Sequence, residues 1–213
     1  MSIDQLVISL GASATRQRRG TIPQRIALGV IAGGVVTLAI IVLRLGFRPD
    51  LAVAMHGFAF WMKATYTLSL AIIATLATAH LARPEARRPR WLGLAALPIA
   101  GLALLAAGEL VRTPLSDWPE LWSGISWRVC SRWVATLALP ILAGLMIAFR
   151  RFAPTRLRLT GAVAGLAAGA TAATLYSLHC PEVSAVFVLT WYSLGIAVAA
   201  TIGGLLGPRL LRW

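Results

Sequence analysis

The chain has 213 residues, of which 58% are hydrophobic and 13% are charged, and its net charge is +13. About a quarter of the residues are charged in an ordinary soluble domain, so a soluble fold of this size is excluded. A basic chain can indicate nucleic-acid binding, but the arginines flank apolar runs and no nucleic-acid-binding motif is present. We therefore expect a protein of the lipid bilayer that makes no direct contact with nucleic acid.

Six apolar runs follow one another along the chain, each close to the roughly 20 residues that a membrane-spanning helix needs. They cover residues 26–43, 58–81, 91–111, 133–149, 159–179 and 184–206. Spans in lipid have to be helices, because an open sheet edge would leave backbone groups unpaired. The sequence thus predicts an all-α fold, a six-transmembrane helical bundle over residues 26–207. A short cytoplasmic N-terminal tail (1–25) and C-terminal tail (208–213) flank it.

Basic residues are unequally divided between the two sides of the predicted bundle. The side that carries both termini holds 14 of the 20 basic residues and two of the seven acids, whereas the other side holds six and five. Loops rich in Lys and Arg stay in the cytoplasm. We therefore predict a multi-pass protein with both termini cytoplasmic.

The spans lack the features of a transport pathway or of an enzyme active site. Ionisable residues within a membrane mark transport pathways, but Lys63, His80, Glu109 and His179 all lie near span ends. No metalloprotease, hydrolase or phosphate-loop motif is present. We expect no enzyme. A small multi-pass transporter and a scaffold subunit of a membrane complex remain as alternatives to a regulatory anchor.

Glycines recur at four-residue spacing in three of the spans, which allows close contact between helices. They are Gly29 and Gly33, then Gly161, Gly165 and Gly169, and finally Gly203 and Gly207. We expect these glycines to pack helices within one chain, and the oligomeric state stays open.

The two cysteines, Cys130 and Cys180, both fall on the predicted non-cytoplasmic side. They lie 24 residues before and 26 residues after Pro154, where the fourth and fifth spans turn, so their heights differ by only about 3 Å. Facing cysteines on packed helices could approach disulfide distance. With the adjacent His179 they could also form a soft-metal site for a transient thiophilic metal. A redox or metal sensor, a structural disulfide and no role all remain open; no resident cofactor is expected.

The N-terminal tail has one apolar stripe. Ile3, Leu6, Val7 and Leu10 follow the i, i+3, i+4, i+7 pattern of a helix face. A helix this short is marginal alone in water, so it would order against a partner's groove or against the membrane surface, which the nearby arginines favour.

Several stretches after residue 47 resemble the NrsF family, negative regulators of sigma F. They are Arg48-Pro49-Asp50-Leu51, Phe60-Trp61-Met62-Lys63, Trp118 through Gly124 with Ser126-Trp127 and Cys130, Leu178-His179-Cys180-Pro181-Glu182, Trp191-Tyr192 with Gly195, and Gly207-Pro208-Arg209-Leu210-Leu211-Arg212-Trp213.

The resemblance implies a six-span protein of the bacterial inner membrane that acts as an anti-sigma factor in a stress response. Such a protein sequesters an extracytoplasmic-function sigma factor. Our main hypothesis is that the chain releases this factor after a periplasmic thiol or metal signal. Cys130 and Cys180 would take part in sensing, and the N-terminal segment would contact the sigma factor. The residues that fit this contact are Ile3, Asp4, Leu6, Val7 and Leu10.

Overall fold

The computed structural model describes residues 5, 21–87, 89–149, 152 and 154–212. The predicted sigma-binding residues Ile3, Asp4, Leu6, Val7 and Leu10 therefore lie outside the described residues. All regular elements in the described part are helical. They are α2 (Thr21–Ile40), the π-helical turn η1 (Ile41–Leu45), α3 (Leu51–Ala54), α4 (Phe58–Leu81), the 3-10 turn η2 (Arg90–Ala95), α5 (Ala96–Arg112), the 3-10 turn η3 (Leu115–Asp117), α6 (Trp118–Ser123), α7 (Trp127–Phe149), α8 (Leu157–Tyr176), α9 (Ala185–Phe187), the π-helical turn η4 (Val188–Tyr192) and α10 (Ser193–Leu210).

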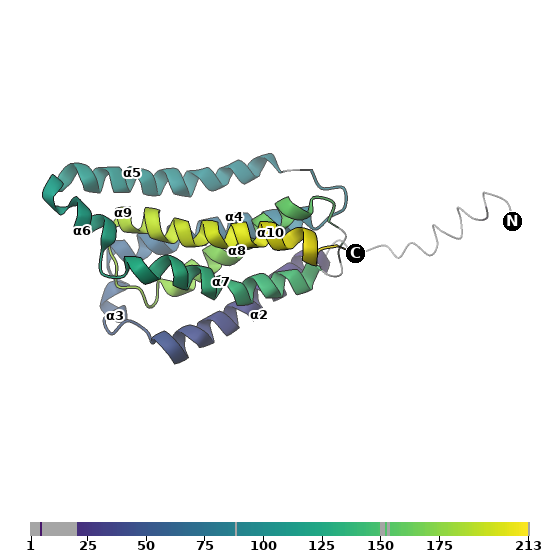
Figure 1. Cartoon of the computed structure of the whole chain (residues 1–213), viewed down its shortest axis with the longest axis horizontal. Coiled ribbons are helices and arrows are strands. Elements are labelled where there is room, and N and C mark those ends of the chain that lie inside the picture. Colours follow the sequence, from purple (N-terminus) through teal and green to yellow (C-terminus); the bar gives the residue numbers. More distant parts are fainter. Residues whose placement is uncertain (1–4, 6–20, 88, 150–151, 153, 213) are drawn as a thin grey trace.

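Six helical segments of the described chain are long and apolar enough to cross a membrane. They cover Ile22–Leu45, Phe58–Leu81, Arg90–Arg112, Leu115–Phe149, Leu157–Tyr176 and Ala185–Leu210. The predicted all-α, multi-pass architecture is confirmed. Figure 1 shows the long helices running side by side, with the start of α2 and the end of α10 at the same end of the bundle. Which end faces the cytoplasm stays a prediction from charge.

Glycine contacts bring α8 and α10 together along most of their length. A Cβ added at Gly161 would collide with the backbone of Gly203, and one at Gly165 would collide with the carbonyl oxygen of Ala199. Such close approach is what small residues allow between helices in lipid. The expectation that these glycines pack helices within the chain is confirmed.

Close backbone contacts at glycines also join α2 to α7. A Cβ at Gly29 would lie 2.8 Å from the Gly144 carbonyl oxygen, and one at Gly33 would lie 2.7 Å from the Pro140 carbonyl oxygen. The Thr37 hydroxyl donates a hydrogen bond to the Leu137 carbonyl oxygen at 2.9 Å. Helix α2 is thus fixed to α7 over several turns.

Helix α5 stands apart from the other spans along one edge of the bundle (Figure 1). An open apolar groove of about 630 Å³ lies between α4 and α5. Near the end of α5, Glu109 Oε2 accepts hydrogen bonds from the Ser184 hydroxyl at 3.0 Å and from the Val186 N–H at 3.1 Å. This carboxylate therefore ties α5 to the segment that enters α9.

Candidate functional site

Polar contacts converge on the connection between α8 and α9, residues 177–184, which we call the Cys180 loop. The Cys180 N–H donates to the Tyr176 carbonyl oxygen at 3.0 Å and closes the end of α8. At the other end, the Ser184 hydroxyl accepts from the Phe187 N–H at 3.3 Å and caps α9. Both ends are capped, so the intervening residues form a short, well-defined link between the α8 and α10 spans.

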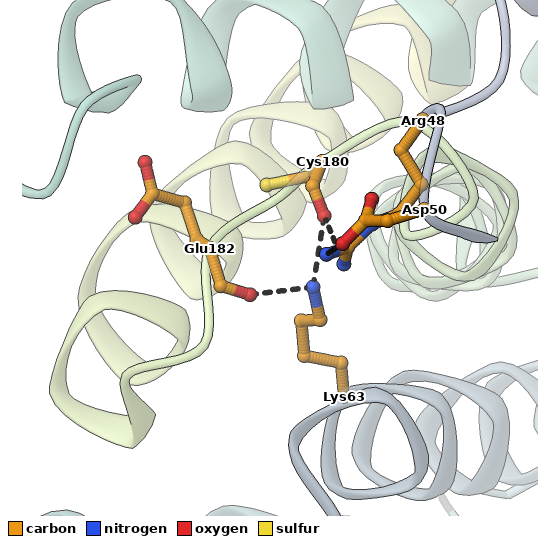
Figure 2. A network of polar contacts seen from close by, with 5 residues as sticks. All are labelled: Arg48, Asp50, Lys63, Cys180 and Glu182. Carbon is orange, nitrogen blue, oxygen red and sulfur yellow. Dashed lines mark hydrogen bonds and ion pairs between the residues drawn. The ribbon is translucent and has the colours of Figure 1, made fainter. Parts of the chain in front are cut away.

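Lys63, in the second turn of α4, holds the middle of this loop (Figure 2). Its Nζ donates to the Cys180 carbonyl oxygen at 3.0 Å and to the Glu182 carbonyl oxygen at 2.7 Å. The side chain is fully buried. Among the described residues the one ion pair joins Arg48 to Asp50, so Lys63 has no carboxylate partner there. A buried ammonium ion is costly unless nearby dipoles or negative charge stabilise it, and here two backbone carbonyl groups do so.

Arg48 contacts the same loop from the segment after η1. Its backbone N–H donates to the Leu178 carbonyl oxygen at 3.2 Å, and its Nη1 lies 3.5 Å from the Cys180 carbonyl oxygen. Its Nε and Nη2 bind the Asp50 carboxylate at 2.7 and 2.6 Å. These hydrogen bonds raise the pKa of Arg48 and lower the pKa of Asp50. Asp50 thus orients the guanidinium group against the Cys180 loop.

Glu182 ties the Cys180 loop to the start of α7. Its Oε1 accepts three hydrogen bonds of 2.8 Å, from the Ile125 N–H, the Ser126 N–H and the Ser126 hydroxyl. Gly124 turns the chain here with φ +50°, and a Cβ on it would lie 2.8 Å from the Glu182 carboxyl carbon. A carboxylate before a helix start is also favoured by the helix dipole. We call these three hydrogen bonds the Glu182 clamp. They hold the turn that precedes α7, and Cys130 lies in the first turn of that helix.

The structure brings Cys130 and Cys180 together. Both thiols are free and fully buried, and each is the other's hydrogen-bonding neighbour. This hydrogen bond, and then the positive charge of Lys63, lowers the pKa of the Cys180 thiol, although burial acts in the opposite direction. The pair is therefore arranged so that one thiol can carry negative charge while the other donates to it.

His179 does not join the two cysteines. Its Nδ1 lies 2.9 Å from the Gly46 carbonyl oxygen. In the described part of the chain, no three His, Cys, Asp or Glu side chains are grouped to hold a metal ion. The three-ligand soft-metal site considered for Cys130, His179 and Cys180 is thus not assembled. The ring of His179 instead pins the loop to the segment after η1.

Several residues acquire a place in the site without having been assigned a role from the sequence: Arg48, Asp50, Lys63, Glu182 and Tyr192, whose hydroxyl approaches the Cys180 thiol. All of them lie in the stretches that resemble the NrsF family. One signal was available for Lys63, because it shares a helix face with Thr67, Leu70 and Ala74, all of which are buried. A lysine on the buried face of a span needs partners from other segments.

Comparison with known proteins identifies the family of the chain. The family model described as "Negative regulator of sigma F" matches residues 10–213. The chain is 39% identical to the "Anti-sigma-F factor NrsF" of Caulobacter vibrioides and 36% identical to the "Probable anti-sigma-F factor NrsF" of Azospira oryzae, in each case over 214 residues and the full length of both chains. No solved structure matches. The family description is that of a regulator, in accordance with the expectation that the chain is not an enzyme. The chain belongs to the NrsF family, negative regulators of sigma F.

Proposed function

We propose that this chain is a membrane-embedded anti-sigma factor that holds an extracytoplasmic-function sigma factor inactive. It releases that factor when an oxidant in the periplasm joins Cys130 and Cys180 in a disulfide. The names of both relatives support a sigma-factor partner. The observation that carries the thiol signal is the pair of adjacent, free thiols, one in the Cys180 loop and one in the first turn of α7, which contacts with several spans hold together.

The charge distribution supports the direction of signalling. The cysteines lie at the end of the bundle opposite the arginine-rich loops, so the rule that basic loops are cytoplasmic assigns them to the periplasmic side. Disulfides form and persist in the bacterial periplasm, whereas cytosolic thiols are kept reduced. The sigma factor would bind on the opposite side, where residues 1–20 precede α2.

Helix packing supports a physical route between the two sides. Cys130 belongs to α7, and α7 is packed backbone to backbone against α2 at Gly29 and Gly33. The Cys180 loop is held by Lys63 of α4 and continues into α8. Because a disulfide would draw the start of α7 toward this loop, it would shift α2 and the tail that precedes it. A tenfold loss of sigma affinity requires a coupling free energy of about 1.4 kcal/mol.

The proposal is tested by recovering the tagged protein in mild detergent from untreated cells and from cells treated with hydrogen peroxide. Wild type is compared with a variant that lacks residues 1–20 and with the double variant Cys130→Ser, Cys180→Ser. We expect wild type to retain a sigma factor in untreated cells and lose it after oxidation. The double variant should retain it in both cases, and the truncated chain in neither.

Two outcomes would contradict this function. If a sigma factor dissociates from the double variant as it does from wild type, the cysteines are not the sensor. If a stable membrane partner co-purifies from every sample and no sigma factor is recovered from any, the chain serves as a scaffold subunit.

A further inference from the structure

The surroundings of the two thiols differ. Cys180 lies beside the Lys63 ammonium group, and the Tyr192 hydroxyl also approaches it. In Figure 2 the carbonyl group of Cys180, rather than its sulfur, points at Lys63, so the ammonium acts on the sulfur through space. Cys130 lies in the first turn of α7, and its thiol faces the Cys180 thiol.

Tyr192 is placed where it can stabilise an anion. Its side chain is fully buried in η4, and its hydroxyl makes no hydrogen bond of ordinary geometry to any other group in the part of the chain that the structure describes. A buried hydroxyl without a partner destabilises the folded state. A thiolate at Cys180 would provide the missing acceptor.

Lys63 provides the second stabilising group. An ammonium ion has three donors, and the two carbonyl groups of the Cys180 loop account for two hydrogen bonds. Its positive charge has no carboxylate partner in the described part of the chain. Negative charge on the neighbouring Cys180 sulfur would balance it.

We propose that Cys180 is the thiol that reacts first with the oxidant, that Cys130 is the resolving thiol, and that Lys63 and Tyr192 are positioning residues that stabilise the Cys180 thiolate. This division of roles rests on the function proposed above. Both thiols are buried, so the oxidant has to be small and uncharged, and a hydroperoxide is the class that we name.

The reaction has two balanced steps. The Cys180 thiolate attacks the terminal oxygen of the hydroperoxide, an S–O bond forms and the O–O bond breaks. One proton is taken up, the alcohol or water leaves, and Cys180 becomes a sulfenic acid, oxidised by two electrons. The sulfur of Cys130 then attacks the sulfur of Cys180. The S–S bond forms, the S–O bond breaks, and the leaving hydroxide combines with the Cys130 proton as water.

The first experiment identifies the attacking thiol. Cys130→Ser and Cys180→Ser, each purified in nanodiscs, are exposed to hydrogen peroxide, quenched in SDS containing dimedone and analysed by mass spectrometry. We expect dimedone-labelled Cys180 in Cys130→Ser, and at least about tenfold slower labelling of Cys130 in Cys180→Ser, because the thiolate is the nucleophile. Equal labelling, or faster labelling of Cys130, would overturn the assignment.

The second experiment tests the positioning residues through the pH dependence of iodoacetamide alkylation at Cys180 in the Cys130→Ser background. The titratable or charged groups around Cys180 in this background come from several elements: Lys63 on α4, Arg48 after η1, Tyr176 on α8, Tyr192 in η4 and Glu182 in the Cys180 loop itself. Position 130 on α7 is then a serine, which does not titrate. Alkylation follows the thiolate fraction, so a lowered pKa makes the rate rise at a lower pH than the roughly 8.5 of a free thiol.

Tyr192→Phe removes the unpartnered hydroxyl alone. We expect alkylation at neutral pH to slow several-fold and the profile to move to higher pH, with no loss of thermal stability, because no other partner is left unsatisfied. Tyr66→Phe is the matched control, since the Tyr66 hydroxyl bonds Ser193 at 2.7 Å, and it should leave the profile unchanged. An unchanged profile in Tyr192→Phe would remove that residue from the proposal.

Lys63→Met should slow alkylation about tenfold, which corresponds to one pKa unit, and Lys63→Arg should restore most of the rate. Where Lys63→Met does not fold, Lys63→Arg and Tyr192→Phe still decide the question. These measurements contain no sigma factor. If Cys180 reacts faster than Cys130 but oxidation leaves sigma-factor binding unchanged, the proposed function is refuted and this inference stands. If oxidation releases the sigma factor but the two thiols react equally fast, this inference alone is refuted.

Discussion

The carboxylate of Glu182 offers the sharpest test of how the two cysteine segments are held together. Replacing Glu182 by Ala removes the shared acceptor of the Ile125 N–H, the Ser126 N–H and the Ser126 hydroxyl. Glu182 is only 8% exposed, so water reaches the vacated site poorly. The turn before α7 would then lose its three hydrogen bonds to the Cys180 loop.

The size of the effect follows from the three donors. An unsatisfied buried donor costs about 1–3 kcal/mol, and the lower end applies to these partly buried groups, which suggests a total of about 3 kcal/mol. In a chain of this length, 1 kcal/mol shifts Tm by roughly 2–4 °C, so we expect a decrease of roughly 6–12 °C. Glu182→Gln keeps one carbonyl oxygen as an acceptor and should lose roughly a third as much.

The assay is thermal unfolding in one detergent, followed by the rate of Cys130–Cys180 disulfide formation with hydrogen peroxide. Glu120→Ala is the control, because Glu120 is an exposed acid on the neighbouring helix α6. Glu182→Ala should unfold at lower temperature and form the disulfide more slowly than the control. If both variants unfold within about 2 °C of each other and form the disulfide equally fast, the Glu182 clamp does not hold the pair, and the reasoning is refuted.

Three further predictions follow from single contacts. Gly33→Ala places a Cβ 2.7 Å from the Pro140 carbonyl oxygen and should destabilise the α2–α7 pair by about 1–3 kcal/mol in thermal unfolding, whereas Gly34→Ala, which faces open space, should not. Thr160→Val removes a buried hydroxyl that has no hydrogen-bond partner among the described residues, so Tm should stay the same or rise; a clear fall would contradict that assignment. Asp50→Asn weakens the orientation of Arg48 at an exposed position, so disulfide formation should change while Tm moves little, and a large fall in Tm would contradict this.

The span boundaries show how far apolar patterning reaches. The second span, predicted as 58–81, agrees with α4 at both ends, whereas the fourth was predicted to begin at residue 133 and α7 begins at Trp127. Arg128 and Arg132 interrupt the apolar run without interrupting the helix, because backbone hydrogen bonding continues into the interface where charged side chains are solvated. Hydrophobic runs therefore locate the bilayer crossings, and the helix ends depend on local capping.

The candidate site was predictable only in part. The equal heights of Cys130 and Cys180 followed from residue counting along a helical hairpin, and the structure places the two thiols side by side. His179 was one possible ligand in a soft-metal site, and its ring lies against the Gly46 carbonyl oxygen instead. Sequence position alone could not show this, because a count along the chain gives height but no rotation about the helix axis. The tail residues from Ile3 to Leu10 lie outside the described residues, so their contact with a sigma factor stays a prediction.

The sequence by itself determined that the chain crosses the bilayer six times as helices. The physical reason is local: the hydrocarbon layer requires spans of a certain length, and a helix satisfies its own backbone hydrogen bonds within each span. Only the tertiary structure decided what surrounds Cys180. Lys63, Cys130 and Tyr192 reach it from three different spans. Their convergence depends on how the helices rotate and pack at their glycine contacts, which no pattern within a single span specifies.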